Sequence, residues 1–139
     1  MTTFNLLVSF NSFLVKEGIK KIMVEEFERP SIKGRAGEYG VKILRGLTPE
    51  KEFKVLLHEG AHYLLGHPWE KLPKGQKEWE AELVVEGILL GVGLPSQGDK
   101  YRLQYEPGNP RLEKVQEVVN KVLLYHKAYK PLLSPPKRK

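Results

Sequence analysis

Two histidines and one glutamate are the residues of this sequence whose types and spacing could do chemistry. They lie in the run His58-Glu59-Gly60-Ala61-His62, directly after the apolar residues 55–57. Residues four apart stand one turn above each other on a helix, so the imidazoles of His58 and His62 could bind one metal ion. Glu59 would then lie beside the ion. Zinc held in this way lowers the pKa of a bound water towards ~7, and a neighbouring carboxylate can take the proton.

A third ligand is needed, because a catalytic zinc usually takes three from the protein. Glu78 and Glu82 lie one turn apart on one face of the next predicted helix. Either carboxylate could complete the site, and the other could orient a ligand histidine through its second ring nitrogen. Glu80 points to the opposite face. His67 would lie about 140° away from His62 if the first helix continued, so we expect it to be a capping or surface histidine.

The absence of cysteine among the 139 residues excludes disulfides, thiolate zinc sites and cysteine nucleophiles. Any Zn2+ must therefore be held by histidine and carboxylate. Polar residues interrupt the apolar N-terminal stretch and no basic run precedes it, which fits neither a signal peptide nor a membrane span. We therefore expect a soluble, cytoplasmic protein with no membrane partner.

Basic residues exceed acidic ones, with 23 lysines and arginines against 17 aspartates and glutamates. Part of this excess lies in the tail Lys137-Arg138-Lys139, which says little about a folded surface. The balance allows an acidic partner, but no interleaved aromatic and basic stripe supports nucleic-acid binding. Nucleic acid is therefore an allowed partner without support from a motif.

The segments before the metal motif are predicted to hold one helix and a small sheet. Apolar residues recur at helical spacing between residues 3 and 28 and predict a helix, although residues 4–10 suit a strand equally well and Gly18 weakens the pattern. Residues 31–47 contain short runs of valine, isoleucine and tyrosine bounded by glycine. They predict two or three short antiparallel strands.

The metal motif is predicted to lie on a central helix. Thr48 is a favourable N-cap and Pro49 a favourable first residue, whereas Gly66-His67-Pro68 ends the helix. Its wide apolar stripe is typical of a core helix. Gly60 inside it costs about 1 kcal/mol relative to alanine, and a close approach by backbone or substrate would explain its presence.

Two further helices are predicted after the motif. The first covers residues 77–90 and carries the candidate carboxylates. Residues 96–110 are expected to form a loop with a short strand at residues 101–105. Asn109-Pro110 then starts a C-terminal helix that runs to about Lys130.

These elements predict one α+β domain over residues 1–130, mostly helical with a short antiparallel sheet before the motif helix. Residues 131–139, which contain three prolines and the basic triplet, are expected to form a disordered tail.

The motif and the helix after it together resemble a known family. The apolar run into His58-Glu59-Gly60-Ala61-His62, followed by Glu78-Trp79-Glu80-Ala81-Glu82, resembles the ImmA/IrrE-type zinc metallopeptidases and their relatives in antirestriction proteins of the ArdC kind. In these proteins an apolar run leads into H-E-x-x-H, and a downstream helix with an E-x-E-A pattern carries the acidic third ligand. The resemblance covers about residues 38 to 94.

The resemblance implies a small zincin-like fold and a role for each matching residue. His58 and His62 take the zinc-ligand positions, Glu59 the general-base position and Glu78 the third-ligand position. Many ImmA-type members have asparagine where Glu82 stands. This difference leaves Glu82 as an alternative ligand and favours the antirestriction branch, whose members often carry a second glutamate there.

The residues and the resemblance together predict a zinc-dependent endopeptidase in which Glu59 takes a proton from zinc-bound water. The substrate would be a protein or peptide, and for several members of the family it is a helix-turn-helix repressor. An oxyanion donor is expected, with Tyr63, Tyr101 and Tyr105 as candidates. The alternative is a metal-stabilised binding or antirestriction factor that masks a partner instead of cleaving it.

Overall fold

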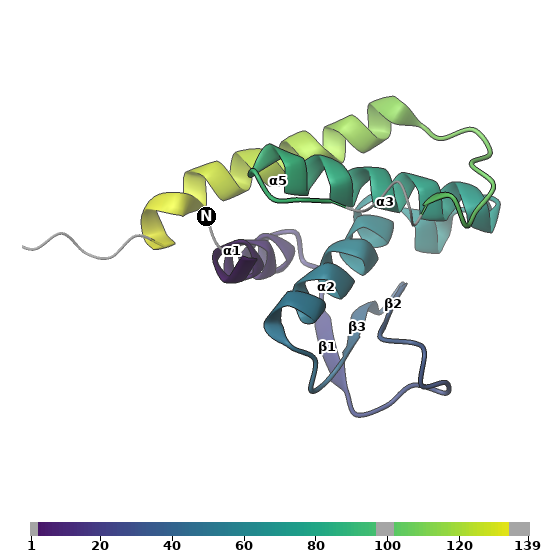
Figure 1. Cartoon of the computed structure of the whole chain (residues 1–139), viewed down its shortest axis with the longest axis horizontal. Coiled ribbons are helices and arrows are strands. Elements are labelled where there is room, and N and C mark those ends of the chain that lie inside the picture. The colour runs from purple at the N-terminus through teal and green to yellow at the C-terminus, as the bar shows by residue number, and fades with distance from the viewer. Residues whose placement is uncertain (1–2, 97–101, 134–139) are drawn as a thin grey trace, which may run out of the picture.

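Helices make up most of the computed structural model, which describes residues 3–96 and 102–133 (Figure 1). The main helices of these residues are α1 (Thr3–Lys16), α2 (Pro49–Leu64), α3 (Lys74–Gly91) and α5 (Leu112–Leu133). A small sheet consists of β1 (Lys21–Val24), β2 (Gly34–Gly37) and β3 (Gly40–Leu44). The expected α+β class, mostly helical with a short sheet before the motif helix, is confirmed.

Helix α2 is the centre of the arrangement. It packs against α1, α3, β2 and β3, and the short 3-10 helix η1 (His67–Trp69) follows it. Helices α3 and α5 lie side by side on one side of α2, and the sheet lies on the other side (Figure 1). The residues of α2 are therefore in contact with nearly every other element.

The helix predicted over residues 3–28 is wrong in its second half. Helix α1 ends at Lys16, and Gly18 has a φ of 76°, a left-handed conformation that glycine adopts without steric cost. The chain then turns back, Ile19 is buried, and residues 21–24 form β1 instead of continuing the helix. Apolar spacing alone suited a longer helix, but the turn at Gly18 takes the later apolar residues into the sheet.

The sheet is mixed, whereas an antiparallel sheet was expected. Strands β2 and β3 form the expected antiparallel pair, but β1 pairs with β3 in parallel, in the order β1-β3-β2. Strand β2 runs back along the sheet before β3 enters between it and β1, so β1 and β3 point the same way. Val41 and Ile43 of the central strand are fully buried against the helices.

Helix α2 begins where the sequence predicts. Thr48 has an extended backbone, and its side-chain oxygen accepts a hydrogen bond from the Lys51 N–H at 3.3 Å, with Pro49 as the first helical residue. Gly66, at a φ of 84°, ends the segment. A Cβ at Gly60 would lie 3.0 Å from ring atoms of Phe10 in α1. The close neighbour of Gly60 is thus an aromatic side chain, rather than the backbone or substrate that we expected.

The later elements differ from the predictions mainly at their ends. Helix α3 starts at Lys74, three residues earlier than expected, and α5 continues to Leu133. The strand predicted at residues 101–105 is not found: Tyr105 N–H donates to the Arg102 carbonyl in a turn, and Tyr101 lies outside the described residues. The structure describes nothing of residues 134–139 in the predicted tail.

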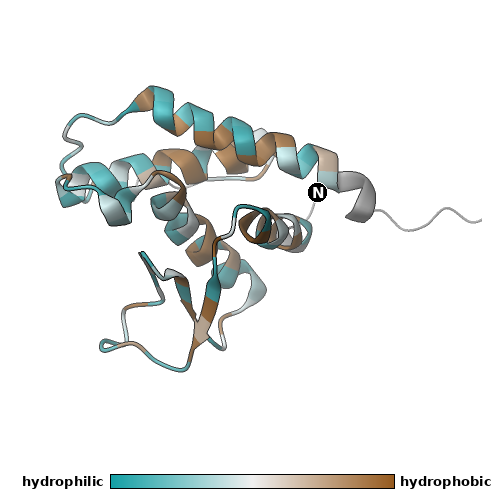
Figure 2. Cartoon of the chain, turned by 180° about the vertical axis from the view of Figure 1, so that it is seen from behind, coloured by the Kyte–Doolittle hydropathy of each residue, from teal (hydrophilic) through white to brown (hydrophobic). Residues whose placement is uncertain are grey.

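Helix α5 closes the core with one apolar side. Apolar and polar residues alternate around it in Figure 2, and four valines face inward. These are Val115, Val118, Val119 and Val122.

Across residues 3–96 and 102–133, no helix combines the length and apolar character that crossing a bilayer requires.

The Thr48 cap yields a stability prediction. Thr48→Ala should lower the free energy of unfolding by about 1 kcal/mol, because one backbone N–H at the start of α2 loses its acceptor. Denaturant unfolding should show a lower midpoint with an unchanged slope. Thr48→Ser keeps the hydroxyl and should unfold close to wild type, and equal losses in both variants would contradict the cap.

Candidate metal centre

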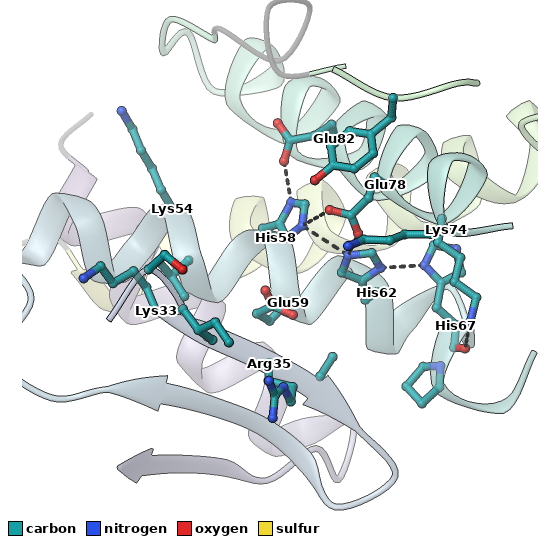
Figure 3. Close-up of a pocket in the computed structure, with 18 residues that line it drawn as sticks. Lys33, Arg35, Lys54, His58, Glu59, His62, His67, Lys74, Glu78 and Glu82 are labelled. Atoms are coloured by element: carbon teal, nitrogen blue, oxygen red, sulfur yellow. Dashed lines mark hydrogen bonds and ion pairs between the residues drawn. The ribbon is translucent and has the colours of Figure 1, made fainter. Parts of the chain in front are cut away.

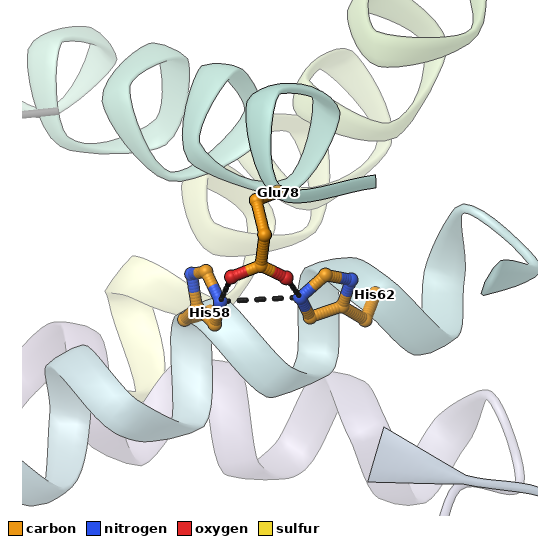
Figure 4. Close-up of side chains that lie close together, drawn as sticks. All are labelled: His58, His62 and Glu78. Atoms are coloured by element: carbon orange, nitrogen blue, oxygen red, sulfur yellow. Dashed lines mark hydrogen bonds and ion pairs between the residues drawn. The ribbon is translucent and has the colours of Figure 1, made fainter. Parts of the chain in front are cut away.

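His58, His62 and Glu78 form a group that could hold a metal ion (Figure 4). Helix α2 places both histidines on the face that meets α3, and Glu78 reaches between them from α3. Its carboxylate oxygens lie 3.3 Å from His58 Nε2 and 2.7 Å from His62 Nε2, and the two Nε2 atoms are 3.1 Å apart. Three candidate donor atoms from two helices therefore converge on one point.

The separations of these atoms fit a small tetrahedral ion. Ligand atoms at 2.0–2.1 Å from zinc in a tetrahedron are about 3.3 Å from one another. The 3.1 Å between the two Nε2 atoms and the 3.3 Å between one Glu78 oxygen and His58 Nε2 are close to this value. The other Glu78 oxygen lies 2.7 Å from His62 Nε2, closer than two ligand atoms of one zinc ion would be. Two imidazoles and one carboxylate leave a fourth position for water or substrate.

Glu82 lies behind His58 rather than beside the convergence point. Its carboxylate is 2.5 Å from His58 Nδ1, the ring nitrogen that points away from His62. This contact orients the His58 ring and leaves its Nε2 atom to face Glu78. The structure thus groups Glu78 with the two histidines and gives Glu82 the contact through the second ring nitrogen.

The charges of the group are strongly coupled. Burial disfavours the charged form of His58, but hydrogen bonds with Glu78 and Glu82 outweigh it and raise its pKa to about 10. Burial raises the pKa of the Glu78 carboxyl group, but its hydrogen bonds with His58 and His62 have the larger effect and hold this pKa well below the usual range. A metal ion would therefore have to displace a proton from His58 at neutral pH.

His67 is buried, so the expectation of a surface histidine is wrong. Its side chain is 3% exposed, and its Nδ1 atom lies 2.7 Å from His62 Nδ1. Its Nε2 atom lies 2.8 Å from a carboxylate oxygen of Glu80, which is fully buried. The positive φ of Gly66 turns the chain after α2 so that η1 folds His67 back beneath His62.

These contacts define the proton positions of both histidines. A metal on His62 Nε2 leaves the ring proton on Nδ1, which then donates to His67 Nδ1. His67 must in turn carry its proton on Nε2 and donate to Glu80. Burial lowers the pKa of His67, and the hydrogen bond with Glu80 raises it by less, so the pKa is about 4. His67 is therefore neutral at pH 7, as these hydrogen bonds require.

Arg111 holds Glu80 in place from the start of α5. Its side chain donates to both Glu80 oxygens at 2.7 and 3.0 Å, and its backbone N–H donates to one of them at 2.9 Å. The same guanidinium donates to Glu70 at 2.7 and 2.9 Å. Neither Arg111 nor Glu70 could be predicted from the sequence: Arg111 lies far from the motif in the chain, and Glu70 lies in the loop after it with no recognisable spacing to the other site residues.

Glu59 lies between the two histidines and strand β2 (Figure 3). Burial raises the pKa of its carboxyl group, the charges of His58 and His62 lower it, and a hydrogen bond with the backbone of Ala36 also lowers it. Gly34 makes this approach possible, since a Cβ there would collide with Val55 of α2. Strand β2 therefore forms one wall of the site directly beside Glu59.

An open cleft of about 890 Å³ contains the metal group and Glu59, whereas the buried Glu80 and its partner Arg111 do not line it. Its walls include His58, Glu59, His62, Glu78 and Glu82. Tyr105 also lines it, whereas Tyr63 packs edge-on against Trp69. Of the three tyrosines predicted as oxyanion donors, Tyr105 is thus the one placed in the cleft, and Tyr101 lies outside the described residues.

Comparisons of the chain with protein-family models, with curated proteins and with solved structures give no match. The function must therefore be argued from the site itself.

The positions of Glu78 and Glu82 predict different effects on metal affinity. Glu78→Gln should weaken binding of a divalent ion strongly, because an amide supplies no charge to replace the carboxylate. Glu82→Gln should cost no more than roughly 10–100-fold, as for a residue that orients a ligand. Competition with a chelator at fixed pH measures both. Loss of the metal in Glu82→Gln with retention in Glu78→Gln would identify Glu82 as the third ligand.

The buried hydrogen-bond chain predicts a remote effect on the same affinity. Glu80→Gln should reduce metal affinity about 10–100-fold, because a neutral amide accepts from His67 more weakly than the carboxylate and can also present its NH2 group, so the proton position of His67 is no longer fixed. It should also lower the free energy of unfolding by about 3 kcal/mol, the low end for a buried pair, since Arg111 is partly exposed.

Glu70→Gln is the matched control, because Glu70 contacts the same arginine but not His67. It should leave the metal affinity unchanged and cost within about 1 kcal/mol of stability. Equal metal affinities in Glu80→Gln and Glu70→Gln would show that the hydrogen bonds from Glu80 through His67 do not affect metal binding at His62.

Proposed function

We propose that this protein is a zinc-dependent endopeptidase. The observation that carries the proposal is the presence of Glu59 in the same open cleft as the His58–His62–Glu78 group. Two imidazoles and one carboxylate are a donor set of catalytic zinc sites. A bound zinc ion supplies Lewis-acid chemistry: it polarises a carbonyl and lowers the pKa of water towards ~7.

Glu59 is the general base in this proposal. Its carboxylate takes a proton from the attacking water and then passes it to the leaving amine. The raised pKa that burial gives Glu59 suits a general base, because a carboxylate with a higher pKa takes up a proton more readily than an exposed one. Tyr105, on the cleft wall, is the candidate to stabilise the developing oxyanion.

The open edge of β2 supports a peptide as the substrate. The Leu44 N–H donates to the Lys33 carbonyl, so along the antiparallel pair the backbone groups of Gly34 and Ala36 point away from β3. The Ala36 N–H donates to Glu59, which leaves the N–H and carbonyl of Gly34 and the carbonyl of Ala36 as the edge groups that a peptide could pair with. Both residues line the cleft. An extended peptide can pair with such an edge and so pass across the metal group.

The resemblance to ImmA/IrrE-type metallopeptidases supports the same function. It rests on the H-E-x-x-H run and on the downstream helix that carries Glu78, and the structure brings these two segments together. By this resemblance, a regulatory protein such as a helix-turn-helix repressor is the substrate class to test first. A binding factor that only masks its partner remains the alternative, and Glu59 distinguishes the two.

The test is Glu59→Gln, made in zinc-loaded protein. We expect zinc to remain bound at one ion per chain and cleavage of a proteome-derived peptide library to fall by about 10²–10⁴-fold, the range for loss of a general base. Glu50→Gln, an equal charge change at the exposed start of α2, should retain activity. Undiminished cleavage by Glu59→Gln, or no cleavage by wild type, would overturn the proposal.

A further inference from the structure

Cationic side chains surround the metal group on the walls of the cleft. Strand β2 and the residues before it, the first half of α2, and the first turn of α3 each contribute. The five side chains are Lys33, Arg35, Lys54, Lys74 and Lys77. The three carboxylates that line the same cleft are Glu59, Glu78 and Glu82. Glu78 contacts both histidines, Glu82 contacts His58, and Glu59 lies beside the two rings.

Most of these cations are not neutralised within the described part of the chain. Arg35 pairs with Glu28, but within residues 3–96 and 102–133 Lys33 and Lys77 donate to the backbone carbonyls of Pro30 and His67 and pair with no carboxylate. A carbonyl accepts a hydrogen bond without cancelling the charge. Lys54 and Lys74 are exposed, and among the described residues neither has a carboxylate within ion-pair distance.

The cations flank the metal group on both sides. Lys33 and Lys54 lie on one side of the two histidines, and Lys74 lies on the other (Figure 3). A chain that crosses the cleft along β2 would therefore meet positive charge before and after the metal group. A concave site with an excess of one sign of charge attracts ligands of the opposite sign, and here the cations lie around the metal group while the three carboxylates are gathered beside the histidines.

We infer that the cleft selects acidic polypeptides, with aspartate or glutamate on both sides of the scissile bond. The part of this inference that concerns cleavage rests on the proposed endopeptidase function. A peptide fits better than a nucleic acid, because the N–H and carbonyl of Gly34 on the β2 edge point away from β3 and offer backbone partners to an extended peptide. Single-stranded nucleic acids need aromatic stacking platforms, and Tyr105 is the single tyrosine, tryptophan or phenylalanine among the described residues that line the cleft.

A binding experiment tests the inference without requiring catalysis. The probes are a labelled peptide of alternating glutamate and alanine, its glutamine counterpart and a single-stranded oligonucleotide, measured by fluorescence anisotropy on zinc-loaded Glu59→Gln protein. We expect the glutamate peptide to bind at least about tenfold more tightly than the glutamine peptide at low salt, with the difference shrinking as salt rises.

Charge reversal at Lys54 and Lys74, the two exposed lysines of the cleft, provides the matched variants. Lys54→Glu/Lys74→Glu should remove most of the preference for the glutamate peptide, a loss of about tenfold. Lys20→Glu/Lys127→Glu changes the net charge equally at exposed lysines that do not line the cleft, and should retain the preference. Circular dichroism and zinc content establish that each variant is folded and loaded.

A cleavage experiment with the wild type adds the second readout. Sequencing the products of a peptide library should show acidic residues enriched on both sides of the cut, and the enrichment should disappear in Lys54→Glu/Lys74→Glu. Cleavage without acidic preference would overturn the inference while leaving the endopeptidase standing. Preferential binding of the glutamate peptide without any cleavage would overturn the endopeptidase proposal while leaving the preference for acidic polypeptides standing. Tighter binding of the oligonucleotide than of the glutamate peptide would overturn the inference in favour of nucleic acid.

Discussion

The contact of Glu78 with His58 and His62 is the constraint on which the rest of the structure depends. Three ionisable side chains meet at a helix crossing with little solvent, and such groups are stable there only when each is paired or bound to metal. The pairing requires α3 to cross α2 at one height and one rotation. The core residues of α1, the sheet and α5 maintain that crossing, and Gly60 allows the Phe10 ring to pack directly on α2.

A second polar network, centred on Glu80, lies beneath the metal group and connects it to α5. Glu80, fully buried, gathers donors from η1, α3 and the start of α5, and so ties the last helix to the metal group through His67 and His62. Buried carboxylates of this kind are costly unless fully satisfied, and here each oxygen has at least two partners. Folding of α5 and the proton position on a candidate ligand are thereby coupled.

The cleft brings together the groups that the proposed peptide hydrolysis needs. A sheet edge, a buried carboxylate and unpaired lysines share one cleft, so peptide binding, proton transfer and selection by charge would act on the same segment of substrate. Neither the sheet edge nor the lysines would indicate this alone, because exposed edges and lysine-rich surfaces are common. Their position around His58, His62 and Glu78 makes the combination specific enough to test.

The sequence by itself determined what depends on neighbours along the chain. The spacing of His58 and His62, the Thr48 cap and the shared face of Glu78 and Glu82 follow from helical geometry, and the structure contains each of them. The tertiary structure decided everything that depends on how elements meet: the turn at Gly18 that makes β1, the burial of His67, the distant Arg111, and which glutamate faces both histidines. Glu78 and Glu82 differ by one helical turn, and only the height at which α3 crosses α2 selects between them.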